Sequence, residues 1–153
     1  MVVLILSIVA SLAVPRLGDT ATTKVRSAAQ VLAADLAFAQ IESIAHSDDL
    51  RLVVLDPTNH RYHIAKASAT STPLTNPITK QPYRVTFGQS DAASLSGVTI
   101  SGSTVGGDNQ LKFGAFGQID QGTDATITLS CDGFTCTLTI HATTGAVTVG
   151  DIQ

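Results

Sequence analysis

The chain has 153 residues, of which 44% are hydrophobic and only 14% are charged. This composition predicts one packed domain with an appendage, and it excludes a disordered chain. The net charge of -3 gives no attraction to phosphate backbones and argues against DNA as a partner.

An apolar run opens the sequence: residues 1–14 hold twelve apolar residues, two serines and no charge, and Pro15 ends the run. As a helix it would span about 21 Å, short of the roughly 30 Å of a bilayer core. A signal peptide cleaved at Ser11-Leu12-Ala13 would lack the usual basic start. A core helix would carry a polar stripe, which Ser7 and Ser11 alone do not make. The remaining interpretation is a membrane span whose first turns are missing.

The stretch from Met1 to Leu17, MVVLILSIVASLAVPRL, resembles the N-terminal helix of type IV pilins and type II secretion pseudopilins. In that family a basic leader is cut after a glycine, and the mature chain starts Phe-Thr-Leu-Ile-Glu-Leu. These features are absent here, so we expect the natural start to lie upstream of Met1. The resemblance implies that residues 1–17 form a membrane and filament-core segment. Its packing residues would be Val2, Val3, Leu4, Ile5, Leu6, Ser7, Ile8, Val9, Ala10, Ser11, Leu12, Ala13, Val14 and Pro15.

Residues 19–47 predict a helix with two apolar stripes, separated by a narrow polar edge of Lys24, Asp35 and Glu42. Two stripes indicate two packing partners, namely the protein's own sheet and a neighbouring subunit. The first stripe comprises Val25, Ala28, Ala29, Leu32, Leu36 and Ala39, continued by Ser43. The second comprises Val31, Ala34, Phe38, Ile41 and Ala45.

From Arg51 onward the hydrophobic period changes to two, which is typical of strands. Residues 66–81, rich in Ser, Thr, Pro and Ala, are expected to form a surface loop. We predict a single head over residues 18–153 with a β-rich part over 51–150. Its fold class is α+β, with the long helix packed on antiparallel sheet. The candidate strands are 51–55, 60–65, 82–87, 97–101, 110–114, 125–131, 134–141 and 145–149.

The hairpin of residues 125–141 has two possible registers. A four-residue loop would pair Cys131 with Cys136, whereas a two-residue Asp132-Gly133 turn would pair Cys131 with Phe134. Both registers keep the apolar face intact, so the pattern leaves the choice open. For an extracytoplasmic head we predict a disulfide between Cys131 and Cys136, which favours the longer loop. Two buried free thiols are the alternative.

Two short segments of the tail, Leu111 to Gly117 and Thr144 to Val147, together with the hairpin resemble the head of H-type minor pseudopilins and related minor pilins. Relatives that take up DNA carry arginines in the second segment. Here residues 146–149 hold no basic residue, which again argues against DNA.

Few residues suggest chemistry. His60 and His63 are three apart on a strand and point to opposite faces, so they do not share a metal ion. Asp120, Asp124 and Asp132 match no calcium loop and are expected in turns. Ser43 and His46 have helical spacing, but no acid orients the histidine. We therefore expect no catalytic residue, no metal and no cofactor.

The sequence thus indicates a structural subunit, a minor pseudopilin or pilin of a type II secretion or type IV pilus-like fibre. The resemblance implies a single-pass protein of the bacterial inner membrane with a periplasmic head, which enters an extracytoplasmic fibre after assembly. Its partners would be other subunits, the inner-membrane assembly machinery and membrane lipid. The alternative is a secreted or periplasmic β-rich binding module with a cleaved signal peptide.

Overall fold

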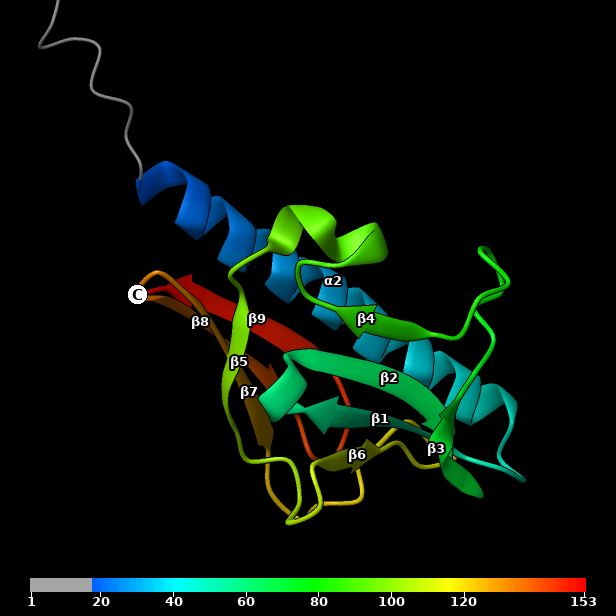
Figure 1. The fold of residues 1–153 in the computed structure, drawn as a ribbon. Coiled ribbons are helices and arrows are strands. Elements are labelled where there is room, and N and C mark those ends of the chain that lie inside the picture. Colours follow the sequence, from blue (N-terminus) through cyan, green and yellow to red (C-terminus); the bar gives the residue numbers. More distant parts are fainter. Residues whose placement is uncertain (1–17) are drawn as a thin grey trace, which may run out of the picture.

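The computed structural model describes residues 18–153. The apolar segment 1–17, with the packing residues predicted over 2–15, lies outside the described residues. Figure 1 shows a long helix, α2 (Gly18–Ala45), running across two antiparallel sheets on one side of both. The structure is therefore α+β, as the sequence predicts. Within residues 18–153, no helix combines the length and hydropathy that a bilayer crossing requires.

Helix α2 forms because its apolar residues recur at helical spacing. All seven members of the first predicted stripe, from Val25 to Ser43, have 0% exposed surface. That prediction is confirmed. The helix ends at Ala45, two residues before the predicted end, and residues 46–48 form a turn into the first strand.

The first sheet has the order β3-β2-β1-β6, and β4 also pairs with β2. A 3₁₀ turn, η1 (Pro57–Asn59), joins its first two strands. The predicted loop over 66–81 is wrong in part, because β3 forms inside it and pairs with β2 across a register shift. The sequence did not predict β3 because its side chains are mostly polar, as a strand at the edge of a sheet allows. The strands are β1 (Arg51–Asp56), β2 (Arg61–Lys66), β3 (Ala69–Pro73), β4 (Arg84–Thr86) and β6 (Gln110–Lys112).

The second sheet has the order β5-β7-β8-β9, and a 3₁₀ segment, η2 (Ser90–Leu95), precedes it in the chain. Along β7 buried and half-buried residues alternate, which explains why the period-two pattern located this strand. The last strand is longer than predicted. Its members are β5 (Thr99–Ser103), β7 (Ala125–Cys131), β8 (Phe134–Ile140) and β9 (Val147–Ile152).

The β7–β8 hairpin corrects the predicted disulfide. Its turn has two residues, Asp132 and Gly133, with φ of 50° and 89°. Two left-handed residues are what a tight type I′ hairpin turn requires. Cys131 therefore pairs with Phe134, and Cys136 pairs with Leu129. The two cysteines are diagonal neighbours, whose Cα atoms lie about 7–8 Å apart in such sheets, beyond ordinary disulfide geometry. Both are buried and free.

One hydrophobic core joins the helix to both sheets. It combines the inner stripe of α2 with the inward faces of the strands and with the buried residues of η2, Ala92 and Leu95. Its largest fully buried side chains include Tyr62, Phe113 and Leu32. The inner face of α2 is thus filled by its own sheets, and function must be sought on the outer face and at the rims.

Candidate assembly surface

The outer side of α2 carries the second predicted stripe. Val31 and Ile41 are 39% and 64% exposed, and Ala34 and Ala45 are exposed as well. Phe38 differs, because it is half-buried and stacks on Tyr83 with ring centroids 5.2 Å apart. The helix is therefore apolar on both sides, and this chain covers the second side only at Phe38.

Two further apolar residues join this surface near the end of α2. Ile44 is 50% exposed and Phe116 is 91% exposed. Gly117, which follows Phe116 in the chain, lies against Ile44, since a Cβ on it would be 3.2 Å from Cδ1 of Ile44. Residues three apart are neighbours on a helix, so Ile41 borders Ile44. We call Ile41, Ile44 and Phe116 the apolar rim.

A tight turn presents Phe116 to solvent. Gly117 N–H donates to the Gly114 carbonyl at 3.0 Å, and Gly114 N–H donates to the Gln118 carbonyl at 2.7 Å. The Gln118 side chain accepts from the Phe116 amide at 3.2 Å. The aromatic ring is thus held outward by a bonded turn rather than by a free loop. The sequence signal for this turn is an aromatic residue between glycines, Gly114-Ala115-Phe116-Gly117. The hydrophobic pattern alone did not predict that Phe116 is exposed.

Gln40 of α2 fastens this turn to the tail. Its side-chain amide donates to the carbonyls of Gly117 and Thr144 at 2.8 and 2.7 Å. A Cβ on Gly145 would lie 2.0 Å from the Gly117 carbonyl oxygen, so only glycine fits. The two short head segments, Leu111 to Gly117 and Thr144 to Val147, therefore meet near the C-terminal end of α2.

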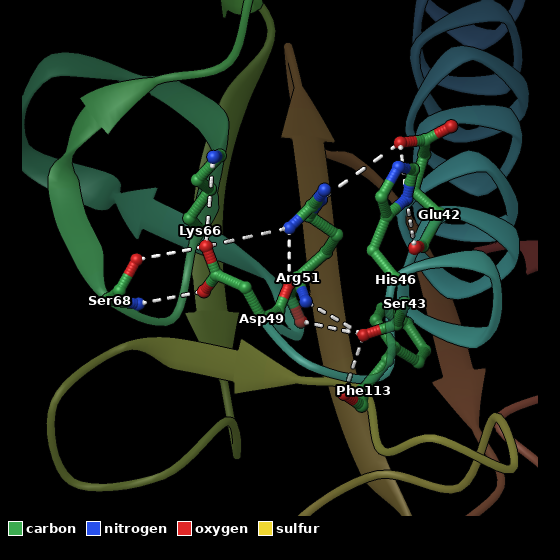
Figure 2. A network of polar contacts seen from close by, with 8 residues as sticks. All are labelled: Glu42, Ser43, His46, Asp49, Arg51, Lys66, Ser68 and Phe113. Carbon is green, nitrogen blue, oxygen red and sulfur yellow. Dashed lines mark hydrogen bonds and ion pairs between the residues drawn. The ribbon is translucent and has the colours of Figure 1, made fainter.

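A polar network locks the last turn of α2 to the first sheet (Figure 2). The buried Ser43 hydroxyl accepts from the Arg51 amide and donates to the Phe113 carbonyl, both at 2.7 Å. The Arg51 side chain is also buried, and its Nε and Nη1 lie 3.9 and 4.0 Å from the carboxylates of Glu42 and Asp49. Among residues 18–153, Arg51 Nε has no hydrogen-bond partner. Ser43 is thus a structural residue and not a nucleophile.

Asp49 extends this network to the β2–β3 connection. It accepts from the Ser68 hydroxyl and amide at 3.0 and 3.3 Å and lies 3.7 Å from Lys66 Nζ. Desolvation raises the pKa of Asp49, but the Ser68 hydrogen bonds and the charges of Lys66 and Arg51 outweigh it, so the net pKa is lowered. The carboxylate stays ionised and holds the corner together.

Asp35 is not a simple surface acid. It accepts hydrogen bonds from the hydroxyls of Tyr62 and Tyr83 at 2.6 and 2.8 Å. Burial raises the pKa of Asp35, and the two tyrosine hydrogen bonds offset this only in part. Burial and the nearby carboxylate also raise the pKa of both tyrosines. This cluster ties the middle of α2 to β2 and to the entry of β4.

The other predicted polar residues have ordinary partners. His60 ends the η1 turn, and His63 contacts the Thr70 carbonyl. Asp124 accepts from the Ala142 amide and contacts His141. Asp132 lies in the hairpin turn. No group of three or more potential metal ligands occurs in the part of the chain that the structure describes.

Comparison with known proteins gives the fold a context. No protein-family model and no curated protein sequence matches the chain. Among solved structures, it is similar to the type IV minor pilin FimU of Pseudomonas aeruginosa PAO1. In the P65 crystal form the TM-score is 0.57 at 19% identity, over 82% of this chain and 92% of FimU. In the P21 form it is 0.54 at 21% identity, over 86% and 87%.

The chain is also similar to the minor pseudopilin EpsH from the type 2 secretion system of Vibrio cholerae. That TM-score is 0.59 at 17% identity, over 82% of this chain and 95% of EpsH. At such identities the likeness concerns the fold, and the head described here therefore has a pilin-like fold.

Proposed function

We propose that this chain is a minor subunit of an extracytoplasmic fibre of the type IV pilus or type II secretion kind. The pilin-like fold supports this proposal, because the compared structures are a minor pilin and a minor pseudopilin. The observation that carries it is the uncovered apolar side of α2 with the apolar rim at its end. The role is structural and not enzymatic.

The apolar rim has the properties of a packing surface. Burying a large apolar side chain that was exposed contributes about 1.5–3 kcal/mol. Aromatic anchors near the centre of an interface often dominate its energy. The backbone around Phe116 is held by the Gly114 turn and by Gln40, so a neighbour would bind this residue without the entropic cost of ordering a loop.

The apolar segment 1–17 has a second role in this proposal. It anchors the chain in the bacterial inner membrane, with the head in the periplasm, before the assembly machinery transfers it into the fibre. Residues 2–15 then pack among the equivalent segments of other subunits, where close helix packing replaces contacts with lipid. This part of the proposal rests on the sequence resemblance.

Substitutions on the apolar rim test the assembly role. Ile41→Asp should reduce the amount of chain recovered in fibres sheared from cells at least tenfold, because a carboxylate would be buried in the interface without a partner. Ile78→Asp is the matched control, since Ile78 is 87% exposed on the loop before β4. It should leave incorporation unchanged. Equal incorporation of the two variants, with equal melting temperatures, would contradict the proposal.

Membrane attachment is tested separately by fractionating cells that express the full-length gene. The chain should be recovered with the inner membrane. N-terminal sequencing provides the second readout. A wholly soluble periplasmic form with a mature end near Val14 would show a cleaved signal peptide, and the secreted binding module would then replace the fibre subunit.

A further inference from the structure

A groove of about 750 Å³ lies beside β4, away from the apolar rim. It is lined by Ser27 and Val31 of α2, by all three residues of β4, by the loop before that strand and by η2. Figure 1 shows β4 lying along α2 between η2 and this loop. The volume falls within the roughly 300–1,000 Å³ of ligand-binding clefts.

The backbone of β4 is unpaired on the side away from β2. The Phe87 amide donates to the His60 carbonyl, and the Ile64 amide donates to the Tyr83 carbonyl, both at 3.1 Å. In an antiparallel ladder these two bonds mean that Val85 faces β2 with its backbone groups, while Arg84 and Thr86 face outward.

Arg84 and Thr86 have four outward backbone groups, and two of these are already hydrogen-bonded within local turns. The Arg84 amide donates to the Pro82 carbonyl at 2.7 Å, and the Thr86 carbonyl accepts from the Gln89 amide at 3.1 Å. The Arg84 carbonyl and the Thr86 amide have no partner within the described residues. One acceptor and one donor, two residues apart on an edge strand, are what an added strand would pair with.

Side chains around the groove define the charge of the guest. Arg61 is paired with Asp56 at 2.7 Å, so its charge is largely neutralised. Arg84 is exposed, and no carboxylate lies within ion-pair distance of it among residues 18–153. Val31 offers apolar surface on the helix side. One acid, Asp91 of η2, also lines the groove and forms no ion pair with a described residue. A carboxylate is therefore favoured next to Arg84 on β4 and disfavoured next to η2, and an apolar side chain is favoured against Val31.

We propose that an extended acidic segment of a partner protein binds in this groove by adding a strand to β4. The Thr86 amide donates to its backbone and the Arg84 carbonyl accepts from it, so main-chain hydrogen bonds provide affinity. The positive charge of Arg84 selects for an acidic side chain in the bound segment. This inference shares Val31 with the outer stripe of α2 but uses no residue of the apolar rim, so it can fail or hold independently of the fibre proposal.

Peptide binding to the full chain, kept in solution with mild detergent, tests the inference. The probe is the blocked pentapeptide Ac-Thr-Val-Glu-Val-Thr-NH2, titrated into isotope-labelled protein and followed by NMR. We expect the Thr86 amide signal to shift on titration and its hydrogen exchange to slow at least tenfold at saturation. The same peptide with Lys in place of Glu, or with methylated backbone nitrogens, should bind at least fivefold more weakly.

Arg84→Glu should lower the affinity for the glutamate peptide at least tenfold and raise the affinity for the lysine peptide. Arg26→Glu is the matched control, because it makes the same charge change at an exposed residue of α2 outside the groove. It should leave both affinities within twofold. The proposal is overturned if neither peptide protects Thr86, or if the two arginine variants behave alike while the amide spectra show intact folds. Either result leaves the fibre-incorporation assay unaffected.

Discussion

Asp35 shows how a residue on the polar edge of a helix becomes part of the core boundary. Sequence periodicity places it between the two apolar stripes, where a solvated carboxylate is expected. In the folded chain two tyrosine hydroxyls from the first sheet donate to it. Desolvation nevertheless dominates, so the folded state holds this proton more tightly than the unfolded state does.

This raised pKa predicts a pH dependence of stability. The stabilisation that comes from the neutral form of Asp35 is fully present below pH 3.8, the ordinary value, and is lost as the pH rises through the folded-state pKa. Relative to Asp35→Asn, the wild-type free energy of unfolding should therefore increase as the pH falls from about 7 to about 4. Urea unfolding of both proteins across this range measures the difference.

The comparison has an internal control. Asp49 and Asp56 have lowered pKa values and lose their stabilising effect on acidification, but they are present in both proteins and cancel. A difference between wild type and Asp35→Asn that is constant with pH, or that reverses, would contradict the assignment.

Gly145 allows a second prediction at the residue scale. Its φ is 65°, and an added Cβ would meet the Gly117 carbonyl. Gly145→Ala combines left-handed strain with a backbone clash and should lower the free energy of unfolding by about 2–5 kcal/mol. Gly133→Ala is the control, because Gly133 has φ of 89° and open space around it. Gly133→Ala should lower the free energy of unfolding by only about 1–2 kcal/mol. Equal losses in denaturant unfolding would show that the Gly117 contact is unimportant.

At the scale of elements, α2 has two apolar faces, of which one is buried in the core and the other is largely exposed. The inner face fills the core between the sheets, whereas the outer face stays uncovered except at Phe38, which stacks on Tyr83. The exposed residues of the outer face, such as Val31 and Ile41, contribute little to the stability of the head. The apolar character of this face is therefore better explained by a partner, which is the basis of the proposed packing role.

Neighbouring residues on α2 separate the two faces experimentally. Leu32 is fully buried and Val31 is 39% exposed. Leu32→Ala should lower the free energy of unfolding by about 2–5 kcal/mol, because it leaves a cavity. Val31→Ala should change it by no more than about 0.5 kcal/mol. Comparable losses from both substitutions would mean that the helix is rotated relative to the structure described here.

At the scale of the whole molecule, the two sheets share one core through α2 and do not form separate units. Leu111 of the first sheet and Leu138 of the second belong to the same buried cluster. A single core of this kind predicts one cooperative unfolding transition.

The chain has two tyrosines and no tryptophan, and this distribution provides a test. Both tyrosines contact Asp35 beside the first sheet, so near-ultraviolet circular dichroism reports on that region. Leu138→Ala in the second sheet should shift the tyrosine-monitored transition as much as the far-ultraviolet one. A tyrosine transition that remains at the wild-type midpoint would show that the sheets unfold independently.

The sequence by itself determined those features of the head that repeat at a fixed local period. The inner stripe from Val25 to Ser43 and the alternating strands β7 and β8 were predicted because side chains three to four, or two, residues apart point to one face. The α+β class followed from these elements, and the similar structures confirm the pilin-like fold.

The tertiary structure alone decided what depends on contacts between distant residues. The hairpin register, and with it the free state of Cys131 and Cys136, was settled by two left-handed turn residues. The pairing of β3 with β2, the hydrogen bonds from the tyrosines to Asp35 and the approach of Gly117 to Ile44 join segments that no local period relates. Hydrophobic pattern records which way a side chain faces, but not which distant residue it meets, and only the folded chain supplies that second fact.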